Sequence, residues 1–580
     1  MMRQRYLAII GAEAALRAHI VRALGRTFHG MLDRPGTLIL TSDTTMAVPL
    51  GTSGVIIGSL RTMGVTGRLE QLSTGAIEAV RTSRGRHLID RYWGSYIALL
   101  TEQGRSGIDV IRSPFGELPC FHVTIGDMTM LASDLTLLIQ TGLYKARLDH
   151  AALARHLAAS DVRRHETCLV GLSELRGGER LTIDRQMSRT TLWSPWSMTA
   201  SDRQIDDIDE AHQRLHDTAR YCVSEQVPRA AKPLLMLSGG LDSSVVAACL
   251  AGRATDFAGL TFVTDAAAGD ERRFARAVTD RFGVPLLEGR LAVGDVDLSV
   301  STAAHLPRPL ARGFEQCTRK LIAAAAEAAG TSCIVNGGGG DNIFCSLQSA
   351  APVADCLLDP NGKGHFWRVT REVADFTQAS VWNVARAAWL RARSGRPFRR
   401  DPDLSYLTLQ AAADAGGALD HPWLAPAPGT FPGKSAQVAL LIGAQAVAED
   451  NDPLSPITST AVLMAQPLVE TCLRIPSWRW FDRGCNRAAA RHAFAAELPA
   501  EIAWRRTKGT PDSFLIQILD ANRALVRETL LDGLLTELGV LDRAAIAAVL
   551  DDPRPARGHS FARIMQLVDA EVWARTWPRQ

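Results

Sequence analysis

The residues best suited to chemistry gather in one short loop, residues 238–244, which reads Ser-Gly-Gly-Leu-Asp-Ser-Ser. An apolar run, Leu234 to Leu237, precedes the two glycines, and a predicted helix opens with the serines. Such a turn presents backbone N–H groups and a helix N-terminus to an anion, while glycine lets the backbone approach closely. The loop lacks the GxxxxGK[ST] spacing of a Walker loop, and Asp242 adds a carboxylate suited to magnesium. A glycine-rich turn with a serine cap is the plainer alternative, but the joint occurrence of these residues predicts a phosphate or pyrophosphate site.

A second loop of similar composition follows another predicted strand and reads Asn336-Gly-Gly-Gly-Gly-Asp341-Asn342. Loops at the carboxyl ends of parallel strands converge on one crevice, although a flexible turn is the alternative for this loop taken alone. Asp242 and Asp341 are therefore the predicted ligands of a Mg²⁺ ion that bridges the phosphates of ATP. The predicted ATP- and pyrophosphate-binding residues are Leu237, Ser238, Gly239, Gly240, Leu241, Asp242, Ser243, Ser244, Val263, Gly337, Gly338, Gly339 and Gly340.

These loops need a parallel sheet to position them, and the sequence from residue 233 alternates strand and helix patterns as such a sheet requires. Strands are predicted at 234–237, 259–263, 284–287 and 332–335, and helices at 243–251, 271–282 and 315–329. Beyond residue 350 the pattern is mostly helical, with a Pro/Gly/Asp-rich interruption near 395–435 that is typical of a loop.

The first part of the chain differs, because short β-rich runs alternate there with Gly and Asp/Ser turns. The composition then becomes polar and afterwards helical, over 207–227. We predict a strand-dominated domain over 1–195, a linker and helix over 196–230, and an α/β domain over 231–580.

Composition limits the classes of function. The chain has 580 residues and a net charge of only +3, with 64 basic and 61 acidic residues, so neither nucleic acid nor a membrane surface is an expected partner. The ten cysteines show no paired CxxC spacing, and a reducing cytoplasm is the expected location. The N-terminus has basic residues before a short apolar stretch, which favours a first strand over a signal peptide. Apolar runs fall short of the roughly 18 residues that span a bilayer.

Several motifs together resemble the asparagine synthetase and β-lactam synthetase family. The synthetase part is identified by SGGLDSS, by Leu260-Thr-Phe with the following Asp270-Glu271, and by GGGGD. An amidotransferase domain is suggested by the segments at 93–100, 112–119 and 132–134, and the family's C-terminal segments by those at 466–470, 486–487 and 505–509. The resemblance implies an N-terminal amidotransferase-like (Ntn) αβ sandwich and a C-terminal α/β ATP-pyrophosphatase domain that activates a carboxylate as an acyl-adenylate, releasing pyrophosphate and then AMP.

One difference from the family concerns the source of the amine that attacks the activated carboxylate. A glutaminase of this family needs an N-terminal cysteine, whereas positions 1 and 2 are both Met and the first cysteine is Cys120. We therefore expect a degenerate amidotransferase domain without glutaminase activity and a nucleophilic amine carried by the substrate. Within the family, the strings at 336–350 and 466–470 look most like lasso-peptide cyclases, which join a peptide's N-terminal amine to an Asp or Glu side chain. The implied partners are a precursor peptide and the leader-binding and leader-peptidase proteins of the same pathway.

The resemblance also implies catalytic roles. Lys508 is the cation expected to stabilise the tetrahedral centre, although a solvated surface lysine is the alternative. Glu372 is the candidate general base, with a helix-surface carboxylate as the alternative. Two other functions stay open at this point. One is an ammonia-dependent asparagine synthetase or a β-lactam-type small-molecule synthetase, and the other is a non-catalytic scaffold that binds peptide.

Overall fold

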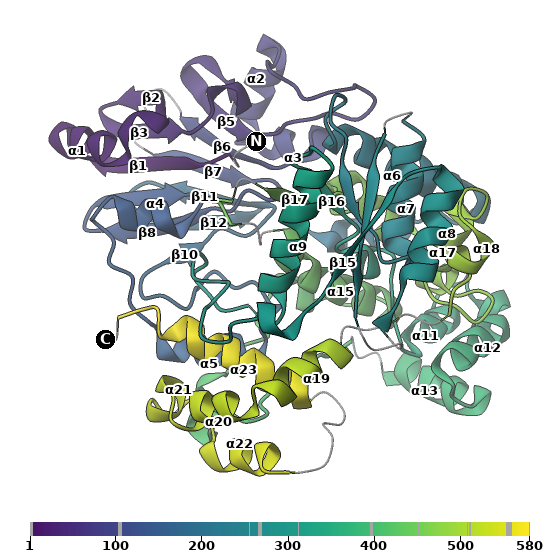
Figure 1. Cartoon of the computed structure of the whole chain (residues 1–580). Helices are drawn as coiled ribbons and strands as arrows, with labels where there is room; N and C mark the ends of the chain where they lie inside the picture. Colours follow the sequence, from purple (N-terminus) through teal and green to yellow (C-terminus); the bar gives the residue numbers. More distant parts are fainter. Residues whose placement is uncertain are drawn as a thin grey trace.

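A computed structural model describes residues 4–101, 107–253, 256–264, 269–310, 312–394, 398–448, 452–455, 457–506, 509, 512–552 and 560–578. The chain forms two antiparallel sheets, one parallel sheet and a surrounding set of helices (Figure 1). Within the described part, no helix is long and apolar enough to cross a membrane.

Two six-stranded antiparallel sheets build the first part of the chain, which confirms that it is rich in strands. The first has the order β10-β8-β9-β1-β3-β2 and consists of β1 (Tyr6–Ala12), β2 (His29–Arg34), β3 (Gly36–Thr41), β8 (Phe121–Ile125), β9 (Met128–Ala132) and β10 (Ser173–Glu174). The second has the order β12-β11-β7-β6-β5-β4 and consists of β4 (Ala47–Pro49), β5 (Gly54–Gly58), β6 (Tyr96–Thr101), β7 (Ile108–Arg112), β11 (Glu179–Ile183) and β12 (Ser188–Thr191).

Strand β1 shows why these sheets stack. Successive side chains of a strand point to opposite faces. Tyr6 and Ala8 pack in the buried cluster shared by the two sheets, whereas Leu7 and Ile9 pack in the cluster that includes the covering helices. Those helices are α1 (Ala14–Leu24) and α4 (Leu135–Gln140) beside the first sheet, α2 (Thr74–Thr82) and α3 (Arg86–Arg91) beside the second, and α5 (His150–Ala158) at the edge. The result is an amidotransferase-like αβ sandwich, as the resemblance implied.

The third sheet is parallel throughout and has the order β15-β14-β13-β16-β17. Its strands are β13 (Leu234–Met236), β14 (Ala258–Val263), β15 (Leu286–Arg290), β16 (Cys333–Asn336) and β17 (Thr458–Ala461). Helices α6 (Ile208–Gln226), α7 (Leu241–Ala251) and α8 (Arg272–Phe282) pack with one face, and α9 (Glu315–Ala328) packs on the other through Ala325 and Ala326. The predicted α/β order is confirmed, with most ends within two residues.

Two strands of this sheet differ from the prediction. Strand β15 extends to Arg290, beyond the apolar residues that indicated it, because it pairs along its whole length with β14. Strand β17 was missed, since Thr-Ser-Thr-Ala has no apolar run and is held by backbone pairing with β16.

The order in which the chain adds strands to this sheet reverses between β13 and β16. From β13 it proceeds outward to β14 and β15, and it then returns to place β16 on the other side of β13. Such a switch point leaves a crevice beyond the carboxyl ends of the two central strands, where ligands of open α/β sheets bind. The two glycine loops predicted to hold nucleotide follow these two strands.

The rest of the chain is helical, as predicted. Its helices are α10 (Gly340–Ile343), α11 (Ala351–Leu358), α12 (Phe366–Thr377), α13 (Val381–Ser394), α14 (Leu409–Asp414), α15 (Pro432–Ala448), α16 (Gln466–Arg474), α17 (Ala488–Phe494), α18 (Ala500–Ala503), α19 (Asp512–Ala521), α20 (Arg523–Leu531), α21 (Leu534–Glu537), α22 (Arg543–Leu550) and α23 (Ser560–Ala574). The interruption near 395–435 contains the short helix α14. Helix α23 returns to the sandwich, where Arg563 donates to the carbonyl of Leu157 at 2.7 Å (Figure 1).

Buried charges tie the sandwich to the rest of the molecule. Glu174, which is 1% exposed, accepts hydrogen bonds from Arg112 of β7 at 2.9 Å and from Arg308, a residue outside the sandwich. Trp193 donates from its indole nitrogen to Glu470 of α16 at 2.8 Å. The two parts of the chain therefore share a specific interface.

Candidate active site

The two glycine loops lie in direct backbone contact at the switch point. A Cβ added to Gly337 would lie 2.7 Å from the backbone nitrogen of Ser243, and one added to Gly340 would lie 2.5 Å from the Cβ of Asp242. Because real Cβ atoms are not found that close, both positions require glycine. The structure thus brings together the two predicted halves of the phosphate site.

The first loop turns sharply into helix α7. Gly239 has φ +67°, and a Cβ there would meet Phe274 of α8 at 2.4 Å. Ser243 and Ser244 both donate from their hydroxyls to the carbonyl of Gly240, at 3.3 and 2.8 Å. These two hydrogen bonds hold the turn through a carbonyl group. The backbone N–H groups at the start of α7 therefore stay available to an anion.

The other predicted loop residues support this turn from the sheet. Leu237 donates its backbone N–H to the carbonyl of Leu260 on β14 at 2.8 Å. Val263 ends β14 and is 3% exposed, so it lies at the carboxyl edge of the sheet as a packing residue. In the second loop, Asn336 accepts a hydrogen bond from the N–H of Gly338 at 2.7 Å and donates to Ser459 of β17 at the same distance.

Asp242 and Asp341 converge, and a guanidinium lies between them. Arg487 donates from Nη1 to both carboxyl oxygens of Asp242 at 3.2 Å and to Oδ1 of Asp341 at 2.5 Å. Arg487 precedes helix α17 and has φ +59°, a left-handed conformation that costs a side-chain-bearing residue free energy. Among the described residues, no group of three or more His, Cys, Asp or Glu side chains could hold a metal. Two carboxylates directed at one point nevertheless form a donor set that suits Mg²⁺, which keeps several waters.

A cavity of about 420 Å³ opens in front of the loops. Within the described part of the chain, four arginines line it, together with Asp341, Ser346, Gln348, Asn486 and Phe376. The arginines are Arg487, Arg491, Arg505 and Arg506. Because guanidinium groups pair well with phosphate oxygens, this lining suits a polyphosphate. The segments 486–487 and 505–509 belong to the motifs found in the sequence, but no role could be predicted for their arginines. These segments are far apart in the sequence, and only the fold places them around one cavity.

The segment that carries Lys508 is held against the first loop. Arg505 donates to the carbonyl of Gly239 at 3.2 Å, stacks 3.5 Å from the ring centre of Phe274, and pairs with Glu271 at 2.5 Å. Glu271 also accepts the N–H of Gly509 at 2.7 Å. Lys508 itself lies outside the described residues, so its role stays a prediction, but residues on both sides of it are anchored beside the nucleotide loop.

Glu372 sits next to the cavity and contacts backbone. It accepts the N–H of Gly484, three residues before Arg487. Phe376 of the same helix contributes to the described cavity lining, and Glu372 does not. The general-base role of Glu372 stays a prediction, whereas the contact itself would position the loop that carries Arg487.

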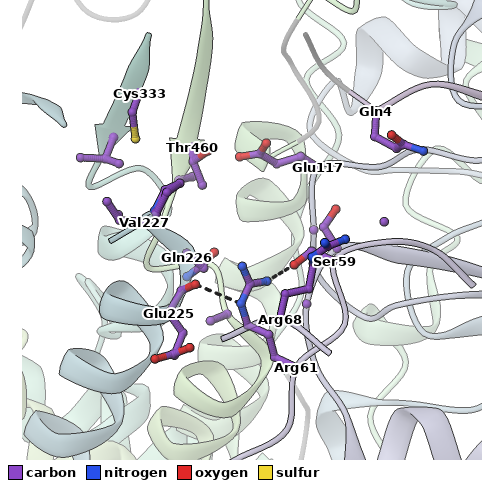
Figure 2. Close-up of a pocket in the computed structure, with 18 of the residues that line it drawn as sticks. Gln4, Ser59, Arg61, Arg68, Glu117, Glu225, Gln226, Val227, Cys333 and Thr460 are labelled. Carbon is purple, nitrogen blue, oxygen red and sulfur yellow. Dashed lines mark hydrogen bonds between the residues drawn. The ribbon is translucent and has the colours of Figure 1, made fainter. Parts of the chain in front are cut away.

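A larger cavity, of about 860 Å³, lies between the sandwich and the parallel sheet (Figure 2). Figure 2 shows Arg61, Glu117 and Gln4 on the sandwich side and Gln226, Cys333 and Thr460 on the other. Arg61 donates to the backbone carbonyl of Glu225 at 3.0 Å, which joins the two sides. Met464 also lines this cavity, and its sulfur would lie 2.2 Å from a Cβ added to Gly339. Met464 therefore lies between this cavity and the second glycine loop.

The thiols of the sandwich are poorly suited to nucleophilic attack. Cys120 and Cys168 are buried, and burial raises their pKa to about 11 and about 12. Because the thiolate is the nucleophile, both would be almost entirely protonated at neutral pH.

Comparisons with known proteins agree with this geometry. The Asparagine synthase family model matches residues 213–411 and 462–575, more than half of the chain, and the Glutamine amidotransferase domain model matches residues 72–194. The first match includes both glycine loops and the segment 486–509, although not residues 412–461 between its two parts.

Three characterised proteins are similar to parts of the chain. The glutamine-hydrolysing asparagine synthetase 3 of Bacillus subtilis is 24% identical over 165 residues, which are 28% of this chain and 26% of that protein. The carboxyethyl-arginine β-lactam synthase of Streptomyces clavuligerus is 31% identical over 169 residues, 27% of this chain and 32% of that protein. The microcin J25-processing protein McjC of Escherichia coli is 19% identical over 426 residues, 72% of this chain and 71% of that protein. The aligned stretch thus spans only a quarter to a third of the first two relatives.

Proposed function

This chain belongs to the asparagine synthase family, and from that premise we propose that it is an ATP-dependent, AMP-forming amide ligase. The observation that carries the proposal is the convergence of the two glycine loops, two carboxylates and four arginines at the switch point of a parallel sheet. Such a site suits the triphosphate of ATP at the moment when a carboxylate attacks the α-phosphorus and pyrophosphate leaves.

Each part of the site has a role in that step. The N–H groups of 238–244 and the arginines of the cavity hold the phosphates and stabilise charge on the departing pyrophosphate. Asp242 and Asp341 would hold Mg²⁺, which supplies further charge neutralisation when bound. In the second step an amine attacks the acyl-adenylate, a C–N bond forms, AMP leaves, and the amine loses a proton. Lys508 would stabilise the tetrahedral intermediate, and Glu372 is the candidate acceptor of that proton.

We further propose that the substrate is a precursor peptide whose own N-terminal amine attacks an activated Asp or Glu side chain, closing a macrolactam as in lasso peptides. Two observations support this choice. The microcin-processing relative aligns over 72% of this chain and 71% of its own length. Burial raises the pKa of both thiols of the sandwich, which argues against a thiolate nucleophile there and so against ammonia released from glutamine. Leader-binding and leader-peptidase proteins are the proposed partners.

Pyrophosphate exchange tests the ligase reaction directly. The protein is incubated with Mg²⁺, ATP, labelled pyrophosphate and a candidate precursor peptide, and label entering ATP is measured. An N-acetylated peptide should support exchange as well as the free peptide does, because acetylation blocks only the second step. Asp242→Asn should lower exchange at least roughly 100-fold. Asp256→Asn is the matched control, since that carboxylate is exposed and pairs with Lys232. Absence of both exchange and AMP with the active peptide and partners would favour a non-catalytic scaffold instead.

The larger cavity supports a second candidate, an ammonia-dependent ligase. It connects the sandwich with Met464 behind the second loop, a path that a small amine such as ammonia would fit. Mass spectrometry separates the two reactions: ammonia leaves a side-chain amide on a linear product, whereas cyclisation removes one water from the peptide. Formation of the linear amide alone would favour this second candidate.

A further inference from the structure

An exposed group of tryptophans and arginines lies on helices α12 and α13, at one edge of the molecule (Figure 1). Three tryptophans are each followed four residues later by an arginine. We call this set the Trp-Arg patch, and it consists of Trp367, Arg371, Trp382, Arg386, Trp389 and Arg393. The tryptophans are 56%, 74% and 50% exposed, which is unusual for the largest apolar side chain.

The patch is ordered by its own contacts. The rings of Trp367 and Trp382 meet edge to face with their centres 6.0 Å apart, which joins the two helices at the surface. The guanidinium of Arg393 lies 5.2 Å from the ring centre of Trp389. Side chains four apart share one face of a helix, so aromatic and cationic groups alternate along the same stripe.

Its charge is strongly positive. Residues 381–400 contain six arginines and no acidic residue, in a chain whose net charge is only +3. Arg391 and Arg400 of this segment are engaged, with Ser349 at 2.7 Å and with Asp161 at 2.6 Å. Arg386 and Arg393 are exposed. An acidic partner would therefore complement the surface.

Helix α12 connects the patch to the candidate active site. Helix α12 runs from Trp367 in the patch to Phe376 in the cavity lining, nine residues or about 13 Å along the helix axis. Helix α13 contacts the same cavity wall through Arg391 and Ser349, which follows the lining residue Gln348. Nine residues are two and a half helical turns, so Trp367 and Phe376 lie on opposite sides of α12, and an extended peptide needs at least about four residues to cover the distance.

We propose that the Trp-Arg patch binds an acidic segment with apolar side chains, located at least about four residues outside the reacting part of the peptide substrate. This inference rests on the proposed peptide ligase function. Tryptophan and arginine are the side chains that most often dominate binding surfaces. A membrane is the less favoured partner, because an interfacial helix places its basic and its aromatic residues on opposite faces, and here they share one stripe.

Binding to synthetic probes tests the patch without any chemistry. Fluorescence anisotropy compares three fluorescein-labelled peptides on the full-length protein, made of Glu-Leu-Gly repeats, Lys-Leu-Gly repeats and polyglutamate. The acidic, leucine-containing probe should bind at least roughly tenfold more tightly than either of the others. The double variants Trp382→Ala/Trp389→Ala and Arg386→Glu/Arg393→Glu should each lose at least roughly tenfold in that affinity. Leu409→Ala and Arg86→Glu, which change exposed residues elsewhere, should not.

Three results would overturn the inference. If both double variants bind the acidic probe as tightly as the wild-type protein does, the patch is not the binding site. If no peptide probe binds, and the wild-type protein binds phosphatidylglycerol vesicles but the variants do not, the partner is a membrane. A wild-type dimer that the variants convert to monomers would make it a second copy of the chain. Unchanged melting temperatures of the variants exclude misfolding, and because the probes need no ATP, failure here is distinct from an absence of pyrophosphate exchange.

Discussion

At the scale of single residues, Arg487 has the most informative position. Its guanidinium bridges the two carboxylates that the sequence motifs indicated as metal ligands. Two carboxylates directed at one point repel each other unless a cation lies between them or one of them is protonated. Arg487 and Mg²⁺ should therefore compete for the same place.

This competition predicts a change in metal response. In Arg487→Gln, Mg²⁺ without ATP should raise the melting temperature more than it does in the wild-type protein, because the metal no longer displaces a guanidinium. Differential scanning fluorimetry across a Mg²⁺ titration measures this, with the neighbouring exposed Arg483→Gln as control. Identical Mg²⁺ responses in Arg487→Gln and wild type would show that the carboxylates do not form the metal site.

Glu271 should act by positioning the segment that contains Lys508. Glu271→Gln loses the ion pair with Arg505 and weakens the contact with Gly509, so the rate of product formation should fall roughly 100-fold, a larger effect than the rise in the KM for ATP that follows from Arg505. Steady-state kinetics measures both quantities. Asp270→Asn is the matched control, because Asp270 pairs with Arg272 on the partly exposed side of the same turn. A KM effect without a rate effect would contradict the positioning role.

At the scale of elements, the sequence predicted the parts that have a strong local pattern. The strand, glycine and helix succession around 234–251 is readable because apolar runs end at glycines. Strand β17 is not readable, since its stability comes from pairing with β16 rather than from its own residues. The two loops also have a local sequence pattern, so the motifs identified them. The arginines that line the cavity have none, and their role became recognisable only because the fold brings α17 and the 505–506 segment to the loops.

His421, two residues before Trp423, should make the free energy of unfolding depend on pH. His421 is buried and accepts the N–H of Trp423 at 3.1 Å, and burial lowers the pKa of its imidazole to about 3. The unfolded chain has a pKa near 6.5 for histidine, so it binds a proton between about pH 6.5 and 3 that the folded chain excludes. Stability from this group is present above pH 6.5 and is lost as pH falls toward 3.

His421→Asn keeps an acceptor at this cap position and removes the titration. Between about pH 6 and 4, the wild-type free energy of unfolding should therefore fall by about 1.4 kcal/mol per pH unit more than that of the variant. Urea denaturation at a series of pH values measures the difference, and the exposed His29→Asn serves as control. Parallel pH profiles for wild type and His421→Asn would refute this role.

At the scale of the whole molecule, the interface between sandwich and synthetase part depends on buried charge. Glu174→Gln would leave Arg112 and Arg308 buried without their shared carboxylate, which should cost about 3 to 5 kcal/mol of stability. The exposed Glu166→Gln should cost far less. Chemical denaturation followed by tryptophan fluorescence compares the two, and equal stability of both variants would show that this triad does not hold the interface.

The central claim is that the site at the β13–β16 switch point joins an amine and a carboxylate of one peptide at the expense of ATP. Mass spectrometry of a candidate precursor peptide incubated with the protein, its partner proteins, Mg²⁺ and ATP tests this claim most directly. We predict a product lighter by one water, formed with one AMP and one pyrophosphate per ring closed and abolished in Asp242→Asn. ADP and phosphate as products, or ring closure that survives Asp242→Asn, would contradict it.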